Sequence, residues 1–259
     1  MDENIMKKNK IKKTPSRPTF LIIAGDGINC EKETKLAFQR SHAEAEIMHI
    51  NDLLTSPARL FNFQGLAIPG GFSFGDELGS GQIMALKFKA VMNDLFQEYV
   101  AQRHPIIGIC NGFQILVKMN LLPESGKKKR MFALAPNYGR QFIDRWVTLE
   151  VASNSICKWT EAIKGKKIRL PIRNGEGRVV FDKKWPSGPL YLAERGQIPL
   201  RYESKNSEVI DADSIAGVCD ESGFILGMMP HPEAILLESH QHAIEDDILK
   251  SMVTYLQHS

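Results

Sequence analysis

A cysteine stands where a predicted strand meets a predicted helix. Residues 108–113 read GICNGF and follow the apolar run PII. Glycines two residues before and two residues after Cys110 allow the backbone to turn sharply without a side-chain clash. With serine at the centre, this spacing forms the nucleophile elbow, which exposes its central side chain at the edge of a sheet. Cys110 is therefore a candidate nucleophile, although a buried structural cysteine fits the two glycines equally well.

Residues 228–233, MMPHPE, supply a candidate base and an acid to orient it. His231 lies between two prolines, which restrict the backbone on both sides. In an extended segment residues two apart point the same way, so Glu233 can accept the imidazole proton and hold the ring toward a thiol. The thiolate is the reactive form of cysteine, and a neighbouring imidazolium stabilises it. The alternative is a surface histidine in a proline-rich loop.

Residues 69–77, PGGFSFGDE, follow another predicted strand and are suited to binding an oxyanion. Gly70 and Gly71 let backbone N–H groups approach a ligand, and two such donors stabilise the oxyanion of acyl transfer. An ordinary glycine turn is the alternative for these residues. A nucleophile, an oriented base and oxyanion donors in one chain point together to a cysteine enzyme of acyl transfer.

The first half of the chain predicts a scaffold that brings these segments together. Short apolar runs alternate with helical patterns, which predicts a mostly parallel, doubly wound α/β sheet with helices on both faces. Functional sites of such sheets lie beyond the carboxyl ends of the strands, where all three segments fall. The expected strands cover residues 19–25, 45–50, 65–71 and 105–110, and the expected helices cover 31–40, 82–100 and 111–120.

After residue 120 the pattern changes. The sequence predicts antiparallel strands and hairpins that extend the sheet, with a turn at 221–223 and a closing helix at 240–256. The expected antiparallel segments are 145–153, 166–181 and 214–233. Residues 121–145, which contain the basic run KKKR at 127–130, are predicted to form a loop.

Length, charge and cysteine spacing limit the number of domains, the kinds of partner and the compartment. The chain has 259 residues, 43% of them hydrophobic, which suits one domain over residues 18–259. Residues 1–17 carry six Lys or Arg and two acidic residues, so they predict a basic, flexible tail. The remainder carries 27 basic and 28 acidic residues, and no apolar run reaches membrane-spanning length, so neither nucleic acid nor a membrane is expected as a partner. The four cysteines form no C-x-x-C pair, which argues against a disulfide framework or zinc site and favours the cytoplasm.

Four segments resemble the class I, or triad, glutamine amidotransferases. They are GICNGFQIL, LAIPGGFSFGD, NGEG and LGMMPHPE. Within that class the set is most similar to the glutaminase subunits of phosphoribosylformylglycinamidine synthases (PurQ type), because of Asn111, Phe113–Gln114 and PGGFSFGD. The resemblance runs from about residue 19 to the end of the chain.

The resemblance implies roles for individual residues. Cys110 is expected to be the nucleophile, His231 the base and Glu233 the orienting acid. The backbone N–H groups of Gly71 and Asn111 are expected to form the oxyanion hole. The residues expected to bind glutamine are Gly70, Phe72, Gln114, Asn174 and Glu176. At Asn174 the family commonly has histidine.

The resemblance also implies the reaction and the partners. Glutamine is expected to be hydrolysed to glutamate and ammonia through a thioester. The ammonia then passes to a synthetase subunit (PurL type), with a small accessory subunit (PurS type) as a further partner, and amidates formylglycinamide ribonucleotide. The chain has no G-x-x-x-x-G-K-[ST] motif, so ATP and Mg²⁺ are expected on the synthetase, and no metal or cofactor is expected here. The alternatives are a cysteine peptidase or γ-glutamyl hydrolase of the same fold, or a non-catalytic regulatory relative.

Overall fold

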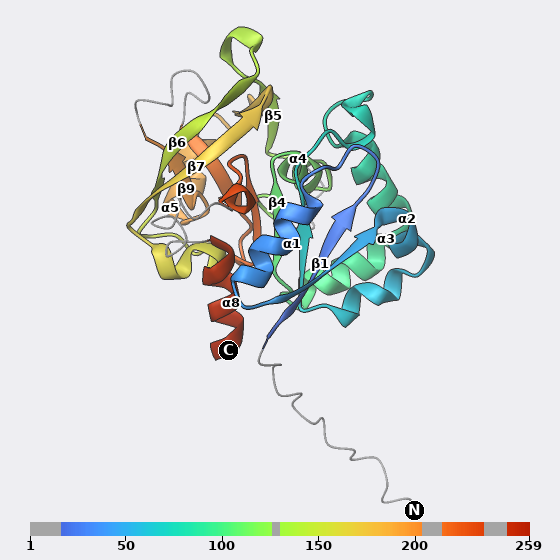
Figure 1. Cartoon of the computed structure of the whole chain (residues 1–259). Helices are drawn as coiled ribbons and strands as arrows, with labels where there is room; N and C mark the ends of the chain where they lie inside the picture. Colours follow the sequence, from blue (N-terminus) through green and yellow to red (C-terminus); the bar gives the residue numbers. More distant parts are fainter. Residues whose placement is uncertain (1–16, 126–129, 204–213, 236–247) are drawn as a thin grey trace, which may run out of the picture.

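A nine-stranded sheet runs through the centre of the molecule (Figure 1). The computed structural model describes residues 17–125, 130–203, 214–235 and 248–259. One half of the sheet consists of five strands that pair in parallel. In sheet order they are β2 (Glu44–His49), β1 (Thr19–Ala24), β3 (Gly65–Ile68), β4 (Ile106–Ile109) and β11 (Ile225–Met228).

Helices cover both faces of this parallel half, as the apolar runs predict. The helices are α1 (Glu31–Arg40), α2 (Ile50–Thr55), α3 (Gln82–Ala101), α4 (Asn111–Lys118) and α8 (Ile248–His258). The chain moves from β1 to β2 in one direction and from β3 through β4 to β11 in the other. Right-handed crossovers therefore place α1 on one face and α3 and α4 on the opposite face. Accordingly α8 packs with α1, and α2 and α4 pack with α3.

Burial on both faces explains why the strands read as continuous apolar runs. The four central residues of β1, Phe20 to Ile23, are fully buried. Phe20 stacks on Phe38 of α1 with ring centroids 4.2 Å apart, and Trp159 packs beside both rings. This core holds the carboxyl ends of the strands in fixed positions. None of the described helices has the length and apolar character needed to span a membrane.

The other half of the sheet is antiparallel, as predicted. Its strands follow β11 in the order β10 (Ile215–Cys219), β9 (Leu200–Tyr202), β6 (Ile143–Val151) and β7 (Lys167–Asn174). The hairpin β10–β11 turns at residues 221–223. The described part of the closing helix is α8, whereas residues 240–247 of that prediction lie outside the described residues.

One prediction for the middle of the chain is wrong. Residues 121–145 are not all loop, because β5 (Phe132–Pro136) lies within them and pairs with β8 (Glu176–Phe181) in a second, two-stranded sheet. The segment 166–181 forms two antiparallel strands, β7 and β8, which do not pair with each other because only Gly175 separates them and a hairpin loop needs about two residues or more. The chain instead leaves the large sheet at Gly175, and β7 pairs with β6.

A further short helix, α5 (Gly188–Glu194), precedes β9 and was not expected. Single 3₁₀ turns cover Pro57–Asn62, Ser73–Asp76, Tyr138–Arg140, Lys158–Ile163 and Pro232–Ala234. The tail expected at 1–17 and the basic run at 127–130 lie almost entirely outside the described residues, so both stay predictions.

Candidate active site

The predicted catalytic segments meet at one edge of the sheet. They follow β3, β4 and β11, which are neighbours in the sheet and end at the same edge because they run in parallel. From β1 the chain first adds β2 on one side and then adds β3, β4 and β11 on the other side, so the order of strand addition reverses between β1 and β3. A crevice at such a reversal is where open α/β sheets bind their ligands.

Cys110 has the backbone of a nucleophile elbow. Its φ of 53° and ψ of −106° lie outside the regions that non-glycine residues usually adopt. A Cβ atom on Gly108 would lie 2.5 Å from the carbonyl oxygen of Gly112, and one on Gly112 would lie 1.9 Å from that of Ile68. Both glycines are therefore required by the close approach of β3, β4 and α4, which agrees with the prediction from their spacing.

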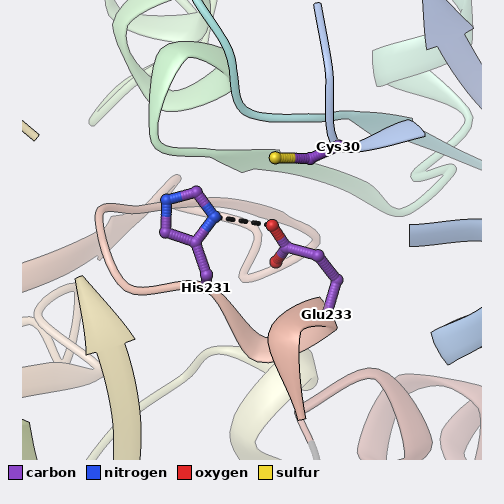
Figure 2. Close-up of side chains that lie close together, drawn as sticks. All are labelled: Cys30, His231 and Glu233. Carbon is purple, nitrogen blue, oxygen red and sulfur yellow. Dashed lines mark hydrogen bonds and ion pairs between the residues drawn. The ribbon is translucent and has the colours of Figure 1, made fainter. Parts of the chain in front are cut away.

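His231 and Glu233 form a buried pair. Nδ1 of His231 lies 2.6 Å from Oε1 of Glu233 (Figure 2). The two residues are only 4% and 1% exposed. The carboxylate therefore fixes the tautomer and orientation of the ring, and Nε2 is the nitrogen left for proton transfer.

The environment of His231 favours its charged form. Burial lowers the pKa of the imidazole, but the charge of Glu233, the nearby thiols of Cys110 and Cys30 and the hydrogen bond to Glu233 raise it by more, so the pKa stands well above its ordinary value. Nε2 is buried and makes no hydrogen bond with a described residue. The thiol of Cys110 instead points to the carbonyl oxygen of Arg173, 3.7 Å away.

Gly70 lies against both the candidate nucleophile and the candidate base. A Cβ atom on Gly70 would lie 2.8 Å from Cε1 of His231, 3.4 Å from Cβ of Cys110 and 3.5 Å from Sγ of Cys30. The three side chains thus converge on one point of the backbone after β3. Cys30, which precedes α1, had no predicted role.

The two predicted oxyanion donors come from the loop after β3 and from the start of α4. Gly71 has a φ of 143°, and its bridge with Ile28 uses the N–H groups of Asn29 and Phe72, so the N–H of Gly71 stays outside that pairing. Asn111 begins α4, where the first N–H groups have no partner within the helix. Both N–H groups therefore have the freedom that an oxyanion hole requires.

The side chain of Asn111 holds the oxyanion loop, residues 71–81, against α4. Its Oδ1 accepts from the N–H of Ser73 at 3.2 Å, and its Nδ2 donates to Oδ1 of Asp76 at 3.2 Å and to Oε1 of Gln114 at 2.9 Å. Gln114 in turn donates to the carbonyl oxygen of Glu176 at 2.8 Å. One network thus connects the loop, the elbow and the start of β8.

A cavity of about 260 Å³ opens beside Cys110. Pockets for drug-sized ligands begin near about 300 Å³, so this volume suits a smaller molecule such as an amino acid. Five of the predicted residues besides Cys110 line it, namely Gly71, Phe72, Gln114, Asn174 and Glu176. Gly70 is not among the lining residues, and it packs instead against His231, Cys110 and Cys30.

Five lining residues were not predicted, namely Asp76, Ser80, Pro136, Phe142 and Arg173. Gly175 also lines the cavity, but it belongs to the NGEG segment, which was expected to line the pocket. Asp76 lies within the predicted oxyanion segment 69–77, Ser80 follows it closely and Arg173 precedes Asn174, so proximity to the motifs was the available signal. Pro136 and Phe142 come from the segment around β5, which had been predicted as a loop, and no signal marked them.

Polar groups in the cavity are available to a ligand. Oδ1 of Asn174 is buried and makes no hydrogen bond with a described residue, while its Nδ2 donates to Asn137 at 3.2 Å. Burial raises the pKa of the Glu176 carboxyl, and the charge of Asp76 adds to this, although Lys118 and Ser80 oppose the shift. Both groups can accept hydrogen bonds, so they are suited to the ammonium group of an amino acid.

Comparison with known proteins agrees with this geometry. Residues 17–256 match the model of the CobB/CobQ-like glutamine amidotransferase domain. The PurQ subunit of phosphoribosylformylglycinamidine synthase from Methanococcus maripaludis strain C7 is 36% identical over 247 residues, covering 90% of this chain and 89% of that one. The PurQ subunit from Dehalococcoides mccartyi is 37% identical over 231 residues, covering 88% and 89%.

A solved structure supports the same assignment. A chain in the structure of PurLQS from Thermotoga maritima superposes with a TM-score of 0.74 and 31% identity, covering 93% of this chain and 99% of that chain. A glutamine amidotransferase from the same organism shares the fold, with a TM-score of 0.56 at 14% identity, covering 94% and 99%. This chain therefore belongs to the CobB/CobQ-like glutamine amidotransferases and, within them, to the family of PurQ subunits of phosphoribosylformylglycinamidine synthase.

Proposed function

We propose that this chain is the glutaminase subunit that releases ammonia from glutamine for phosphoribosylformylglycinamidine synthesis. The buried His231–Glu233 pair beside the Cys110 elbow carries the proposal. It places an oriented proton carrier and a nucleophile around Gly70, next to a cavity of amino-acid size.

The first half of the reaction forms a thioester. Sγ of Cys110 attacks the side-chain amide carbon of glutamine, and the carbonyl oxygen becomes an oxyanion that receives hydrogen bonds from the N–H groups of Gly71 and Asn111. Loss of one such donor typically reduces the rate by about 10²–10³. His231 then donates its proton to the amide nitrogen, the C–N bond breaks, and ammonia leaves.

The second half restores the enzyme. A water molecule gives a proton to Nε2 of His231 and attacks the thioester carbon. The C–S bond breaks, glutamate leaves, and Cys110 returns as a thiolate beside the imidazolium. Glu233 keeps its hydrogen bond to Nδ1 throughout, so the ring presents the same nitrogen in both halves.

The ammonia has its consumer on a partner. We propose that a PurL-type synthetase subunit, with a PurS-type accessory subunit, takes the ammonia and amidates formylglycinamide ribonucleotide. ATP and Mg²⁺ belong to that partner under this proposal. The four free thiols fit a reducing compartment, so we place the reaction in the cytoplasm.

The test is a Cys110→Ala variant in the assembled complex. Synthesis driven by glutamine should disappear, while synthesis driven by added ammonia should continue at the wild-type rate. In the wild-type chain, a glutamine analogue that alkylates thiols should label Cys110, as mapped by mass spectrometry. Labelling of another cysteine, or failure of ammonia to rescue the variant, would contradict the assignment. Turnover of γ-glutamyl peptides without turnover of free glutamine would identify a γ-glutamyl hydrolase instead.

A further inference from the structure

A second thiol lies beside the catalytic pair and has no part in the mechanism above. Sγ of Cys30, a ring nitrogen of His231 and a carboxylate oxygen of Glu233 lie within 4.8 Å of one another. Figure 2 shows the sulfur of Cys30 directed toward the His231–Glu233 pair. Cys30 is partly exposed, whereas the other two side chains are buried, so an ion can reach the cluster from the side of Cys30.

Two atoms of this cluster lack partners. Nε2 of His231 and Oε2 of Glu233 are buried, and neither makes a hydrogen bond with any described residue. Buried polar atoms are nearly always paired in folded proteins, and each exception calls for a ligand, a water or a function. Proton transfer accounts for Nε2, but it does not account for Oε2.

The donor set has a definite chemical preference. A thiolate, an imidazole and a carboxylate are the three ligand types of zinc in proteins, at bond lengths of about 2.0–2.3 Å. In a tetrahedral site these lengths place neighbouring ligand atoms about 3.3–3.8 Å apart. The hydrogen-bonded pair of Nδ1 of His231 and Oε1 of Glu233, now 2.6 Å apart, must therefore open by about 1 Å, and the widest separation in the cluster, up to 4.8 Å, must close by about 1 Å. Rotation of the Cys30 side chain supplies the second movement, because its thiol already lies beside His231 and its hydrogen bond to Asn29 is exposed.

We propose that Cys30, His231 and Glu233 form an inhibitory site for Zn²⁺. The ion takes one ligand atom from each residue, and a water molecule fills the fourth position. Two negative charges, the thiolate and the carboxylate, then balance the charge of the ion in a buried setting. Cys110 is not required as a ligand.

Zinc at this site stops glutamine hydrolysis. A ring nitrogen of His231 that binds the ion no longer carries a proton, and a Glu233 that binds it no longer orients the ring. This consequence rests on the proposed function, but the binding site does not. Synthesis driven by ammonia uses neither residue, so it continues in the presence of zinc.

The site itself is tested by cobalt absorption in the full chain. Co²⁺ bound by a thiolate absorbs in the near ultraviolet, and Cys157 and Cys219 are both fully buried. The Cys110→Ala variant should give this band on titration with Co²⁺, and the Cys30→Ser/Cys110→Ala variant should lose it. A band that disappears in Cys110→Ala, or one that survives replacement of Cys30, would overturn the proposal. Serine is a favoured helix N-cap, and Cys30 makes no capping hydrogen bond at α1, so the fold should tolerate the exchange.

The consequence is tested by inhibition of the assembled complex. The Zn²⁺ concentration that halves glutamine-dependent synthesis should rise at least tenfold in Cys30→Ser, whose activity without zinc should stay near wild type. Ammonia-dependent synthesis should not change at the same zinc concentrations. Equal inhibition of wild type and Cys30→Ser would place the inhibiting ion on Cys110 and His231 and refute the proposal. If the chain hydrolyses no glutamine at all, the proposed function fails, while the cobalt titration still decides the site.

Discussion

Gly70 packs against both the imidazole ring of His231 and the side chain of Cys110. A Cβ atom at this position would lie 2.8 Å from Cε1 of the imidazole and 3.4 Å from Cβ of the cysteine. The first distance is shorter than real Cβ atoms tolerate, so a methyl group here must displace the ring. The spacing of base and nucleophile therefore depends on the absence of a side chain at Gly70.

The first prediction is that Gly70→Ala lowers glutamine turnover at least 100-fold. A displacement of about 1 Å in a catalytic group can reduce a rate about 100-fold, and overpacking of this kind costs about 1–3 kcal/mol of stability. Turnover and thermal melting of the variant measure the two effects. Gly165→Ala is the control, because Gly165 has a φ of 76° but nothing within 4 Å of its Cβ position. Similar turnover in both variants would show that the contact with His231 has no catalytic importance.

The second prediction concerns Glu233→Gln and the stability of the fold. Burial lowers the pKa of His231, but Glu233 and the nearby thiols raise it by a larger amount, so the pKa in the folded chain lies well above its ordinary value. The folded chain therefore holds the imidazole proton more tightly than the unfolded chain. Stability from this pair is therefore complete below the unfolded value of about 6.5 and is lost as pH rises through the higher folded value. The difference in unfolding free energy between wild type and Glu233→Gln should be largest at pH 6 and should shrink toward pH 9.

Urea denaturation across this pH range measures that difference. Glu46→Gln serves as the control, because Glu46 forms an exposed ion pair with Arg59 at 3.4 Å and should contribute little at any pH. A gap that stays constant or widens toward pH 9 would contradict a raised pKa at His231.

The parallel half of the fold, the elbow at Cys110 and the pairing of His231 with Glu233 could be predicted because their signals are local. Strands buried on both faces must be apolar throughout, and the elbow must have small residues at Gly108 and Gly112, so both leave marks in a few consecutive residues. β5 left no decisive mark. Its residues, FALAP, form an apolar run, but a run of five beside a basic segment does not by itself distinguish a strand from a loop, and only Phe132 in it is buried.

The role of Cys30 could not be read from the sequence for a different reason. It lies 201 positions before His231, and the two meet only because β1, β3, β4 and β11 are neighbours in the sheet. Strand order depends on the packing of the whole domain. It therefore imposes no fixed sequence spacing between Cys30 and His231 that could be recognised as a motif. The prediction that Gly70 contacts glutamine has a similar origin. The sequence shows that Gly70 precedes an expected oxyanion donor, but it does not show which side chains pack against Gly70.

The third prediction is that Asn111→Ala lowers kcat at least tenfold. The backbone N–H proposed for the oxyanion hole remains, so the effect reports the side chain, which anchors Ser73 and Asp76 to α4. Without it the N–H of Ser73 loses its buried partner, which costs about 1–3 kcal/mol, and the oxyanion loop gains freedom. Steady-state kinetics with glutamine in the complex measure the change. Asn154→Ala removes one exposed hydrogen bond to Ala193 and should leave kcat within twofold; an equal loss in both variants would argue against loop anchoring.

The fourth prediction is that Leu78→Glu weakens binding to the synthetase subunit at least tenfold. Leu78 is 70% exposed and lies in the oxyanion loop between two residues that line the cavity, and Phe72 and Phe142 at the cavity are 51% and 56% exposed. Exposed apolar side chains gathered at one place mark a surface that a partner covers. Calorimetric titration measures the affinity. Leu190→Glu on α5 is the matched control, since Leu190 is 60% exposed but away from the cavity, and equal losses would mean that the cavity rim is not the docking surface.

The fifth prediction is that the chain alone is a poor glutaminase and that the synthetase, with its nucleotide and substrate, raises glutamine turnover at least tenfold. In the oxyanion loop, Phe74 and Asp76 have φ values of 55° and 54°, which are left-handed and unfavourable for residues with a side chain. Each costs about 1–2 kcal/mol, so the contacts of Asn111 must offset this strain and a loop conformation without it competes in the free chain. Binding of the synthetase at Leu78 and Phe72 supplies further compensation, and a shift of about 2–4 kcal/mol corresponds to roughly 30- to 1,000-fold in rate.

Turnover is measured by glutamate release from the purified chain before and after the synthetase is added. Leu78→Glu should retain the low basal rate but need a higher synthetase concentration for activation. Equal turnover with and without the synthetase would exclude control through this loop and favour an enzyme that acts alone.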